Sequence, residues 1–99
     1  MQILQLVSRE TTENLQVLIK QKERELRGKG TTFFMKKRNV WHHEKYPGWI
    51  NIKSVGKRIV VFEIQTRAEG KEWQLTQALV GYLNRHFSKD IELLSIYFV

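Results

Sequence analysis

The 99-residue chain contains no cysteine and only one proline. Without cysteine it cannot form a disulfide framework, a thiolate zinc site or a thiol nucleophile. Its apolar runs are all much shorter than the roughly 20 residues of a membrane-spanning helix. The first residues carry no basic lead and no cleavage site, so we expect no signal peptide. These features predict a cytoplasmic protein with no membrane partner.

Length and composition predict one folded domain over residues 1–99. Hydrophobic residues make up 41% of the chain and aromatic residues 11%, which is ordinary for a globular protein and excludes a disordered tail. A domain of this size buries roughly 60–70% of the surface that its unfolded chain exposes. The core is therefore thin, and a homodimer is one expected way to compensate.

Positive charge is concentrated in the middle of the sequence. The chain has 17 Lys and Arg residues against 10 Asp and Glu residues, a formal net charge of +7. Residues 20–67 hold thirteen of the basic and four of the acidic residues, a net charge of +9, and the remainder has a net charge of −2. Such a field attracts polyanions through counterion release, whatever their sequence. Nucleic acid is therefore the first partner to consider.

Hydrophobic periodicity predicts a helix, three strands, a second helix and a final strand. Leu15, Leu18, Ile19 and Leu26 recur at helical spacing, with Thr11 or Thr12 as the expected cap. Residues 2–7 fit either a strand or an extension of this helix, and the pattern leaves both open. The expected elements are a helix over residues 12–27 ended by Gly28 and Gly30, strands over 31–38, 49–54 and 58–66, a helix over 69–87 and a strand over 91–99.

The two strands around Gly56 are expected to form a hairpin with one apolar face. A register that places Ile52 opposite Val60 and Ile50 opposite Phe62 gathers five apolar side chains on one side. A slip by one residue exchanges the two faces, so this segregation should decide the register. The apolar face would carry Ile50, Ile52, Val60, Phe62 and Ile64, and the other face Trp49, Asn51, Lys53, Ile59, Val61, Glu63 and Gln65.

The last strand is almost uniformly apolar, which is typical of a central strand buried on both faces. A strand, a helix and a strand joined by short links imply a right-handed crossover, so this strand should lie parallel to one of the hairpin strands. The expected fold is α/β (α+β), with a mixed sheet and helices packed on it. A ferredoxin-like α+β sandwich is the rival, and it requires residues 2–7 to be a strand.

Residues Glu63-Ile64-Gln65 lie near the end of a strand whose sequence predicts burial, and Asn51 lies on the preceding one. At these residues and in its element order the chain resembles the PD-(D/E)XK nuclease core, the restriction-endonuclease-like fold. The resemblance implies an acid on the second strand and Glu-x-Lys on the third, which together hold a divalent metal such as Mg²⁺.

Only Glu63 matches that motif fully, because Asn51 stands at the first acid position and Gln65 at the lysine position. Glu10 or Glu13 would have to assist from the first helix. The resemblance therefore implies a catalytically degenerate member rather than an active enzyme, with Glu63, Gln65 and Asn51 as its catalytic positions. A plainer reading is that Glu63 pairs with Arg58, Arg67 or Lys53, and no cofactor is then needed.

Basic and aromatic residues also alternate around the first strand and the loop after it. Cations follow phosphates, and exposed rings stack on unpaired bases. The predicted nucleic-acid-binding residues are Lys36, Lys37, Arg38, Trp41, Lys45, Lys53, Lys57 and Arg58. His42 and His43 are adjacent and would point to opposite faces of a strand, so no metal site is expected there.

Three functions follow from the sequence. The leading hypothesis is a small, basic, non-catalytic nucleic-acid-binding protein. The first alternative is a structural or protein-interaction module that forms a homo-oligomer. The second is a metal-dependent nuclease of the PD-(D/E)XK type.

Overall fold

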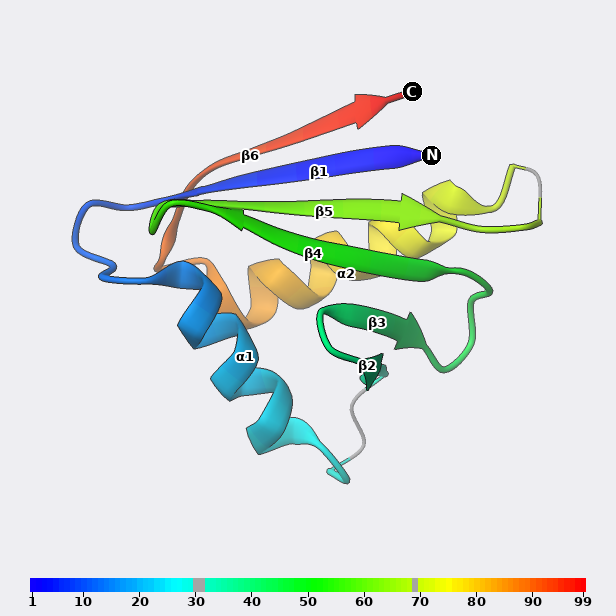
Figure 1. Cartoon of the computed structure of the whole chain (residues 1–99), viewed down its shortest axis with the longest axis horizontal. Coiled ribbons are helices and arrows are strands. Elements are labelled where there is room, and N and C mark those ends of the chain that lie inside the picture. The colour runs from blue at the N-terminus through cyan, green and yellow to red at the C-terminus, as the bar shows by residue number, and fades with distance from the viewer. Residues whose placement is uncertain (30–31, 69) are drawn as a thin grey trace.

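A computed structural model describes residues 1–29, 32–68 and 70–99. These residues form an α+β fold with two helices and a six-stranded antiparallel open sheet (Figure 1). The sheet order is β2-β3-β4-β5-β1-β6, and every neighbouring pair of strands is antiparallel. The elements are β1 (Gln2–Ser8), α1 (Leu15–Leu26), β2 (Phe33–Lys37), β3 (Val40–His43), β4 (Trp49–Val55), β5 (Ile59–Gln65), α2 (Glu72–Phe87) and β6 (Ile91–Phe98).

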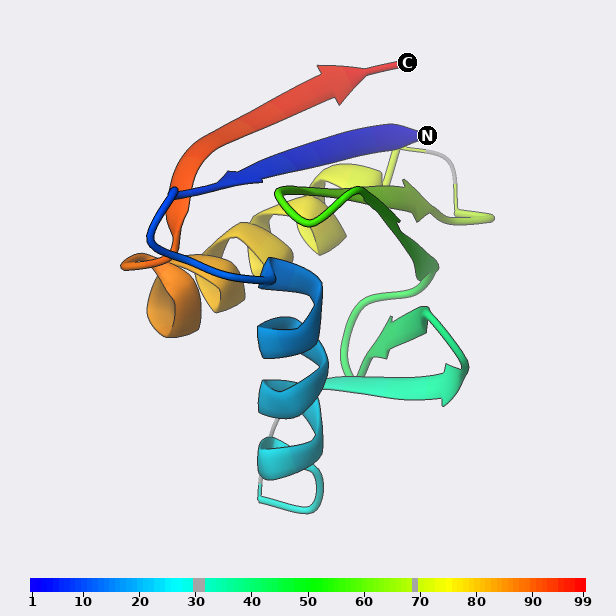
Figure 2. The ribbon, with the colours of Figure 1, turned by 60° about the vertical axis from the view of Figure 1, so that its left-hand side comes forward.

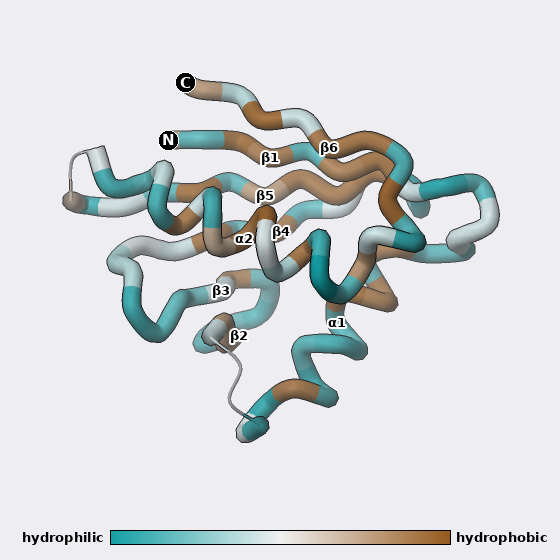
Figure 3. Tube along the Cα trace, turned by 180° about the vertical axis from the view of Figure 1, so that it is seen from behind, coloured by the Kyte–Doolittle hydropathy of each residue, from teal (hydrophilic) through white to brown (hydrophobic). Residues whose placement is uncertain are grey.

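Both helices pack against the same face of the sheet (Figure 2). Alternate residues of β1, β4 and β5 point into this core, where Leu4, Phe62 and Ile64 are fully buried. They meet the apolar stripes of the two helices, for example Leu15 of α1 and Leu79 of α2. The alternation leaves the other face of these strands uncovered. Figure 3 shows the result as hydrophobic central strands beside a largely hydrophilic α1.

Helix α1 begins at Leu15, three residues later than the sequence suggested. Its cap is Asn14, whose side-chain oxygen accepts a hydrogen bond from the Val17 N–H at 3.3 Å. The predicted caps Thr11 and Thr12 are wrong. Thr12 is instead a buried hydroxyl that donates to Asp90 Oδ1 at 3.0 Å, tying the β1–α1 loop to the turn before β6.

The two faces predicted for the β4–β5 hairpin are confirmed, but the register is wrong. Ile52 lies opposite Phe62 and Ile50 opposite Ile64, two residues from the predicted pairing. The last pair is Val55 and Ile59, so the turn has the expected three residues but lies one residue later along the chain. Because side chains repeat every two residues, a slip of two keeps each of them on its face. The separation of apolar from polar side chains therefore predicts the two faces but cannot distinguish registers that differ by two residues.

The region predicted as a loop after β2 contains a further strand, β3. It returns alongside β2 through a turn at Asn39, whose φ of 62° is positive. Asparagine is among the few residues besides glycine that adopt this conformation. The turn has no Gly or Pro to mark it in the sequence, so the prediction of three strands between the helices was one short.

The outermost strand β6 pairs with β1, which answers the question left open for residues 2–7. Both β5 and β6 run antiparallel to β1, which lies between them, so β6 does not pair in parallel with a hairpin strand. The predictions of a mixed sheet and of a central β6 buried on both faces are wrong. Leu93 is 53% exposed and Phe98 71% exposed.

The predicted ends at residues 30, 31 and 69 lie outside the described residues. In the part of the chain that is described, no helix is both long enough and apolar enough to cross a membrane.

Candidate nucleic-acid interface

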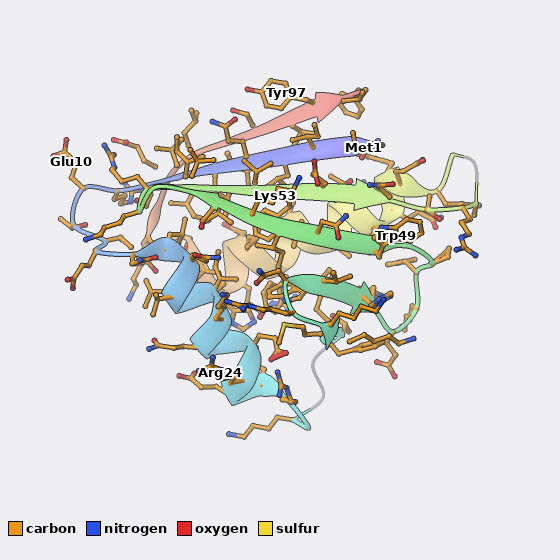
Figure 4. All side chains as sticks on the ribbon, in the orientation of Figure 1. Met1, Glu10, Arg24, Trp49, Lys53 and Tyr97 are labelled. Carbon is orange, nitrogen blue, oxygen red and sulfur yellow. The ribbon has the colours of Figure 1, made fainter. Side chains whose placement is uncertain are left out.

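Five cations belong to α1 and to the β2–β3 hairpin that packs against it, and we call them the α1–hairpin surface. Lys20 and Arg24 come from α1, Lys36 and Lys37 from β2, and Arg38 from the turn that follows. Arg24 lies at the far end of the molecule from β6 (Figure 4). A cleft of about 300 Å³ opens between the helix and the hairpin; it is lined by Lys20, Glu23, Arg24, Met35, Arg38, Asn39 and Trp41.

Among the described residues that line this cleft, the one carboxylate, Glu23, is already neutralised. Glu23 is 4% exposed and accepts two hydrogen bonds from the Arg27 guanidinium, at 2.6 and 2.7 Å. Both bonds come from the same nitrogen, Arg27 Nη2, and these charge-assisted contacts with Glu23 raise the pKa of Arg27. Within the described residues, Lys20, Arg24 and Arg38 form no ion pair. The cleft therefore has uncompensated positive charge.

Trp41 is removed from the predicted set of ligand-contacting residues. Only 2% of it is exposed, and its ring contacts Phe33, Phe62 and Tyr82 at centroid distances of 5.9, 6.4 and 5.6 Å. A ring enclosed in this way cannot stack on a base. Its role is to anchor the hairpin to α2 and to the central sheet.

Phe34 is a more accessible ring that the sequence analysis missed. It is 38% exposed and stacks on His42 with a centroid distance of 5.8 Å and an interplanar angle of 23°. Lys36 is two residues along the same strand, at the irregularity in register that follows Met35. The signal was present in the sequence, since Phe33 and Phe34 are adjacent in a strand and only one of them can face the core.

The other predicted basic residues are spread over different parts of the molecule. Lys53 lies on the open sheet face and pairs with Glu63 at 3.1 Å. Arg58 donates to the Ser8 carbonyl at 2.9 Å and to Glu92 at 3.3 Å, so it holds β6 near the β4–β5 turn. Lys57 lines a separate cleft near the start of α1, and Lys45 lines one beside α2.

Lys20 and Arg24 belong to the surface but were not predicted as site residues. They are four residues apart on α1 and therefore neighbours on one side of the helix. The charged outer side of this helix was visible in the sequence. What the sequence lacked was the packing of α1 against β2, which brings these cations to the hairpin.

Asn51 and Glu63, two of the three predicted catalytic residues, are brought together. They are directly opposite each other in β4 and β5 on the open face, whereas Gln65 is opposite Trp49. Glu63 is held by Lys53, one of the partners that the plainer reading named. Glu10 follows the far end of β1, whereas Glu63 is opposite Ile3, so Glu10 does not reach it. In the described ranges no three His, Asp or Glu residues cluster as metal ligands would.

His43 is fixed by backbone donors at the end of β3. Its Nδ1 accepts hydrogen bonds from the N–H groups of Lys45 and Tyr46, at 2.9 and 3.2 Å. Burial lowers the pKa of this imidazole. The neutral ring, with its proton on Nε2, therefore shapes the loop between β3 and β4 and does not act as a cation at neutral pH.

Comparisons with protein-family models, with curated proteins and with solved structures gave no significant match.

Proposed function

We propose that the protein is a non-catalytic nucleic-acid-binding domain and that it binds the phosphate backbone with the α1–hairpin surface. The observation that carries this proposal is the convergence of Lys20, Arg24 and Arg38 on one cleft whose only carboxylate is occupied by Arg27. A polyanion that enters the cleft meets several cations at once and displaces no internal partner of theirs.

The physical basis is the release of counterions from the polynucleotide. Each phosphate neutralised by a cation makes the slope of log K against log salt more negative, by about 0.9 for duplex DNA and about 0.7 for a single strand. Lys36 and Lys37 extend the surface along the hairpin, and both are exposed. Phe34 adds a ring on which an unpaired base can stack, an interaction of about 1–3 kcal/mol.

Stacking on the rest of the sheet has less support. Sheets that bind single strands stack bases on rings of their central strands. Here the open face of β1 and β5 carries no ring, because the one aromatic residue of these strands, Phe62, faces the core. We therefore assign most of the affinity to phosphate contacts, with little preference for base sequence.

The experiment is a fluorescence-anisotropy titration of single- and double-stranded DNA and RNA between about 50 and 200 mM salt. We expect steep salt dependence for the parent protein. The triple variant Lys20→Gln, Arg24→Gln, Arg38→Gln should bind on the order of a hundredfold more weakly at about 0.1 M salt. Its slope for duplex DNA should become shallower by about 0.9 for each phosphate that is no longer neutralised.

The matched control removes the same charge elsewhere through Arg9→Gln, Lys71→Gln and Lys89→Gln. These three cations are exposed and lie outside the α1–hairpin surface. The control should retain most of the affinity. Equal losses in the two triple variants would mean that net charge alone drives binding, and no binding by the parent at low salt would remove the proposal.

We also propose that the architecture is ferredoxin-like, and the order of elements and strands supports this. Without the β2–β3 hairpin, the remaining elements follow the order β-α-β-β-α-β, and the sheet order becomes β4-β5-β1-β6. A split βαβ unit of this kind has one strand inserted between the two that flank the helix. On this interpretation, the hairpin that carries Lys36, Lys37 and Arg38 is an insertion into a common framework.

A further inference from the structure

The sheet ends at β6, whose outer side pairs with no strand in the described residues. The Val99 N–H donates to the Met1 carbonyl at 3.2 Å, so the backbone of residue 99 points toward β1. Backbone groups alternate along an antiparallel strand. The N–H and C=O groups of Leu94, Ile96 and Phe98 therefore point away from the sheet, where another strand could pair with them.

The two edges of the sheet differ in how they are protected. The β2 edge is five residues long, carries Lys36 and Lys37, and has an irregular register after Met35. Short length, lysines and irregularities are devices that keep edge strands from pairing. The β6 edge is eight residues long, and its sequence IELLSIYF has no Lys, Arg or Pro. Its own irregularity in register lies near its start, opposite Val7 and Ser8, and from Leu93 onward this edge lacks the protection that the opposite edge has.

Apolar side chains line both sides of the β6 edge. On the open face, Leu93 is 53% exposed and Tyr97 49% exposed. On the helix side, Phe98 is 71% exposed and contacts the ring of Trp73 at 5.7 Å. A groove of about 390 Å³ between α2 and β6 is lined by Val80, Gly81, Asn84, Ser88, Ile91, Glu92 and Leu94. A strand added to this edge would cover apolar surface on both sides.

We propose that β6 pairs antiparallel with β6 of a second copy of this chain, joining the two six-stranded sheets into one. The strand is complementary to itself about Ser95. With Ser95 on the two-fold axis, Leu94 faces Ile96 and Leu93 faces Tyr97 of the other copy, so apolar side chains meet apolar side chains. Glu92, which Arg58 neutralises at 3.3 Å, faces Phe98 rather than a second carboxylate.

The charge distribution favours the same contact. The α1–hairpin surface lies at the other end of the strand order, and Figure 4 places Arg24 and Tyr97 at opposite ends of the molecule. Two copies joined through β6 keep their cationic surfaces as far apart as the sheet allows. A contact through the β2 edge would bring those surfaces together, and like charges that are placed opposite each other repel.

A single cysteine tests the register. Ser95 would lie opposite Ser95 of the second copy in a non-hydrogen-bonded pair, where the Cα atoms are about 4.5 Å apart. This separation is within the range that a disulfide spans. Because the chain has no cysteine, Ser95→Cys creates the only thiol. Under mild oxidation we expect a covalent dimer of twice 11.8 kDa. The control Ser54→Cys, an exposed position in an interior strand, should cross-link far more slowly, and equal rates in the two variants contradict the proposed axis.

Light scattering after size exclusion tests the dimer without a covalent bond. The parent should have the mass of two chains at high concentration and dissociate on dilution. Ser95→Lys places two ammonium groups at the axis and should give the mass of one chain, whereas Ser54→Lys, with the same added charge, should remain dimeric. A parent protein that is monomeric at every concentration overturns the proposal.

Residue-resolved amide exchange separates edge pairing from stacking of the open sheet faces. The outward-pointing amides of Leu94 and Ile96 should exchange rapidly in the dilute protein and become protected as concentration rises. The Ser95 amide, which points to β1, should be protected throughout and is the internal control. A dimer in which the amides of Leu94 and Ile96 stay unprotected would be held by another surface, and the proposal would be wrong.

Discussion

At the scale of single residues, exposure separates the rings that hold the structure from those that can meet a ligand. Trp41 and Phe34 are both aromatic, come from the same hairpin and are equally conspicuous in the sequence. The first is 2% exposed and the second 38% exposed. A strand turns alternate side chains to opposite faces, so neighbouring residues acquire different roles.

Gly48 is the position where an added methyl group should harm the fold most. Its φ is +119°, and a Cβ there would lie 2.3 Å from the Gln65 carbonyl oxygen and 3.1 Å from Leu75 Cδ2. Because that oxygen belongs to the backbone of β5, it cannot move away at low cost. We expect Gly48→Ala to lower the free energy of unfolding by about 3 kcal/mol or more in urea denaturation.

Gly56 provides the comparison, because its φ is +66° and a Cβ there meets nothing within 4 Å. Gly56→Ala should cost only the strain of the left-handed conformation, about 1 kcal/mol. Equal losses at the two glycines would show that conformation, rather than the contact with β5, is what matters at Gly48.

His43 should make stability depend on pH below neutrality. Burial lowers its folded-state pKa, and its Nδ1 accepts two backbone hydrogen bonds. Above the unfolded-state pKa of about 6.5 the ring is neutral in both states and stability is complete. As the pH falls below about 6.5 the unfolded chain takes up the proton first, so stability declines until the folded-state pKa is reached.

Urea denaturation at about pH 7.5 and about pH 5.5, on either side of the ordinary histidine pKa, measures this effect. His43→Asn keeps an acceptor near the position of Nδ1 but does not titrate, so it should lose less stability over this range than the parent. The pKa of His86 is also lowered by burial, and it should account for part of the dependence that remains. An unchanged pH dependence in His43→Asn would assign the effect to other groups.

At the scale of elements, the start of α1 is set by one side chain. Asn14 accepts from the Val17 N–H at 3.3 Å, whereas Thr11, an expected cap, is exposed and is outside the helix. Asn14→Ala should lower the free energy of unfolding by about 1 kcal/mol, and Thr11→Ala should leave it nearly unchanged. Thermal denaturation of both variants checks this. A larger loss of stability for Thr11→Ala than for Asn14→Ala would mean that Thr11 caps the helix, as the sequence suggested.

The sequence predicted those elements whose signal is carried by repeated side chains. The faces of β4 and β5 followed from alternation, and both helices followed from apolar residues three and four apart. The β2–β3 turn had no such signal, because Asn39 adopts a positive φ without glycine or proline. The place of β6 at an edge could not be deduced either, since its partner β1 is more than eighty residues away along the chain.

The candidate site was predicted only in part for the same reason. Lys36, Lys37 and Arg38 are contiguous, so their gathering was visible from the sequence. Lys20 and Arg24 join them only because α1 packs against β2, which is a tertiary contact. Conversely, Lys53 and Arg58 were predicted from the pattern of basic and aromatic residues but are engaged with Glu63 and Glu92.

At the scale of the whole molecule, the net charge of +7 is unevenly distributed. The cations that we propose to bind a polyanion should therefore repel one another and lower the free energy of unfolding. Lys20 and Arg24 are like charges four residues apart on a helix, an arrangement that destabilises by about 0.2–0.5 kcal/mol. The triple variant that removes them with Arg38 should therefore be more stable than the parent, by about 0.5–1 kcal/mol at low salt.

Urea denaturation at low and high salt tests this expectation, since salt screens the repulsion and should bring parent and variant together. Sulfate should stabilise the parent more than the variant, because an anion that binds the folded state shifts the equilibrium toward it. If the triple variant were less stable at low salt, these cations would have a structural role that outweighs their repulsion.

The interior position of β1 in the sheet has a consequence for synthesis on the ribosome. Val7 pairs with Ile59, and Gln2 pairs with both Ile64 and Phe98, so each neighbour of this strand is encoded more than fifty residues downstream. During translation β1 emerges as an apolar strand with neither neighbour yet made. Loop closure over such separations is slow, and unpaired strands are prone to aggregate while they wait. Nascent chains halted before β5 should therefore depend on chaperones more than chains that include it.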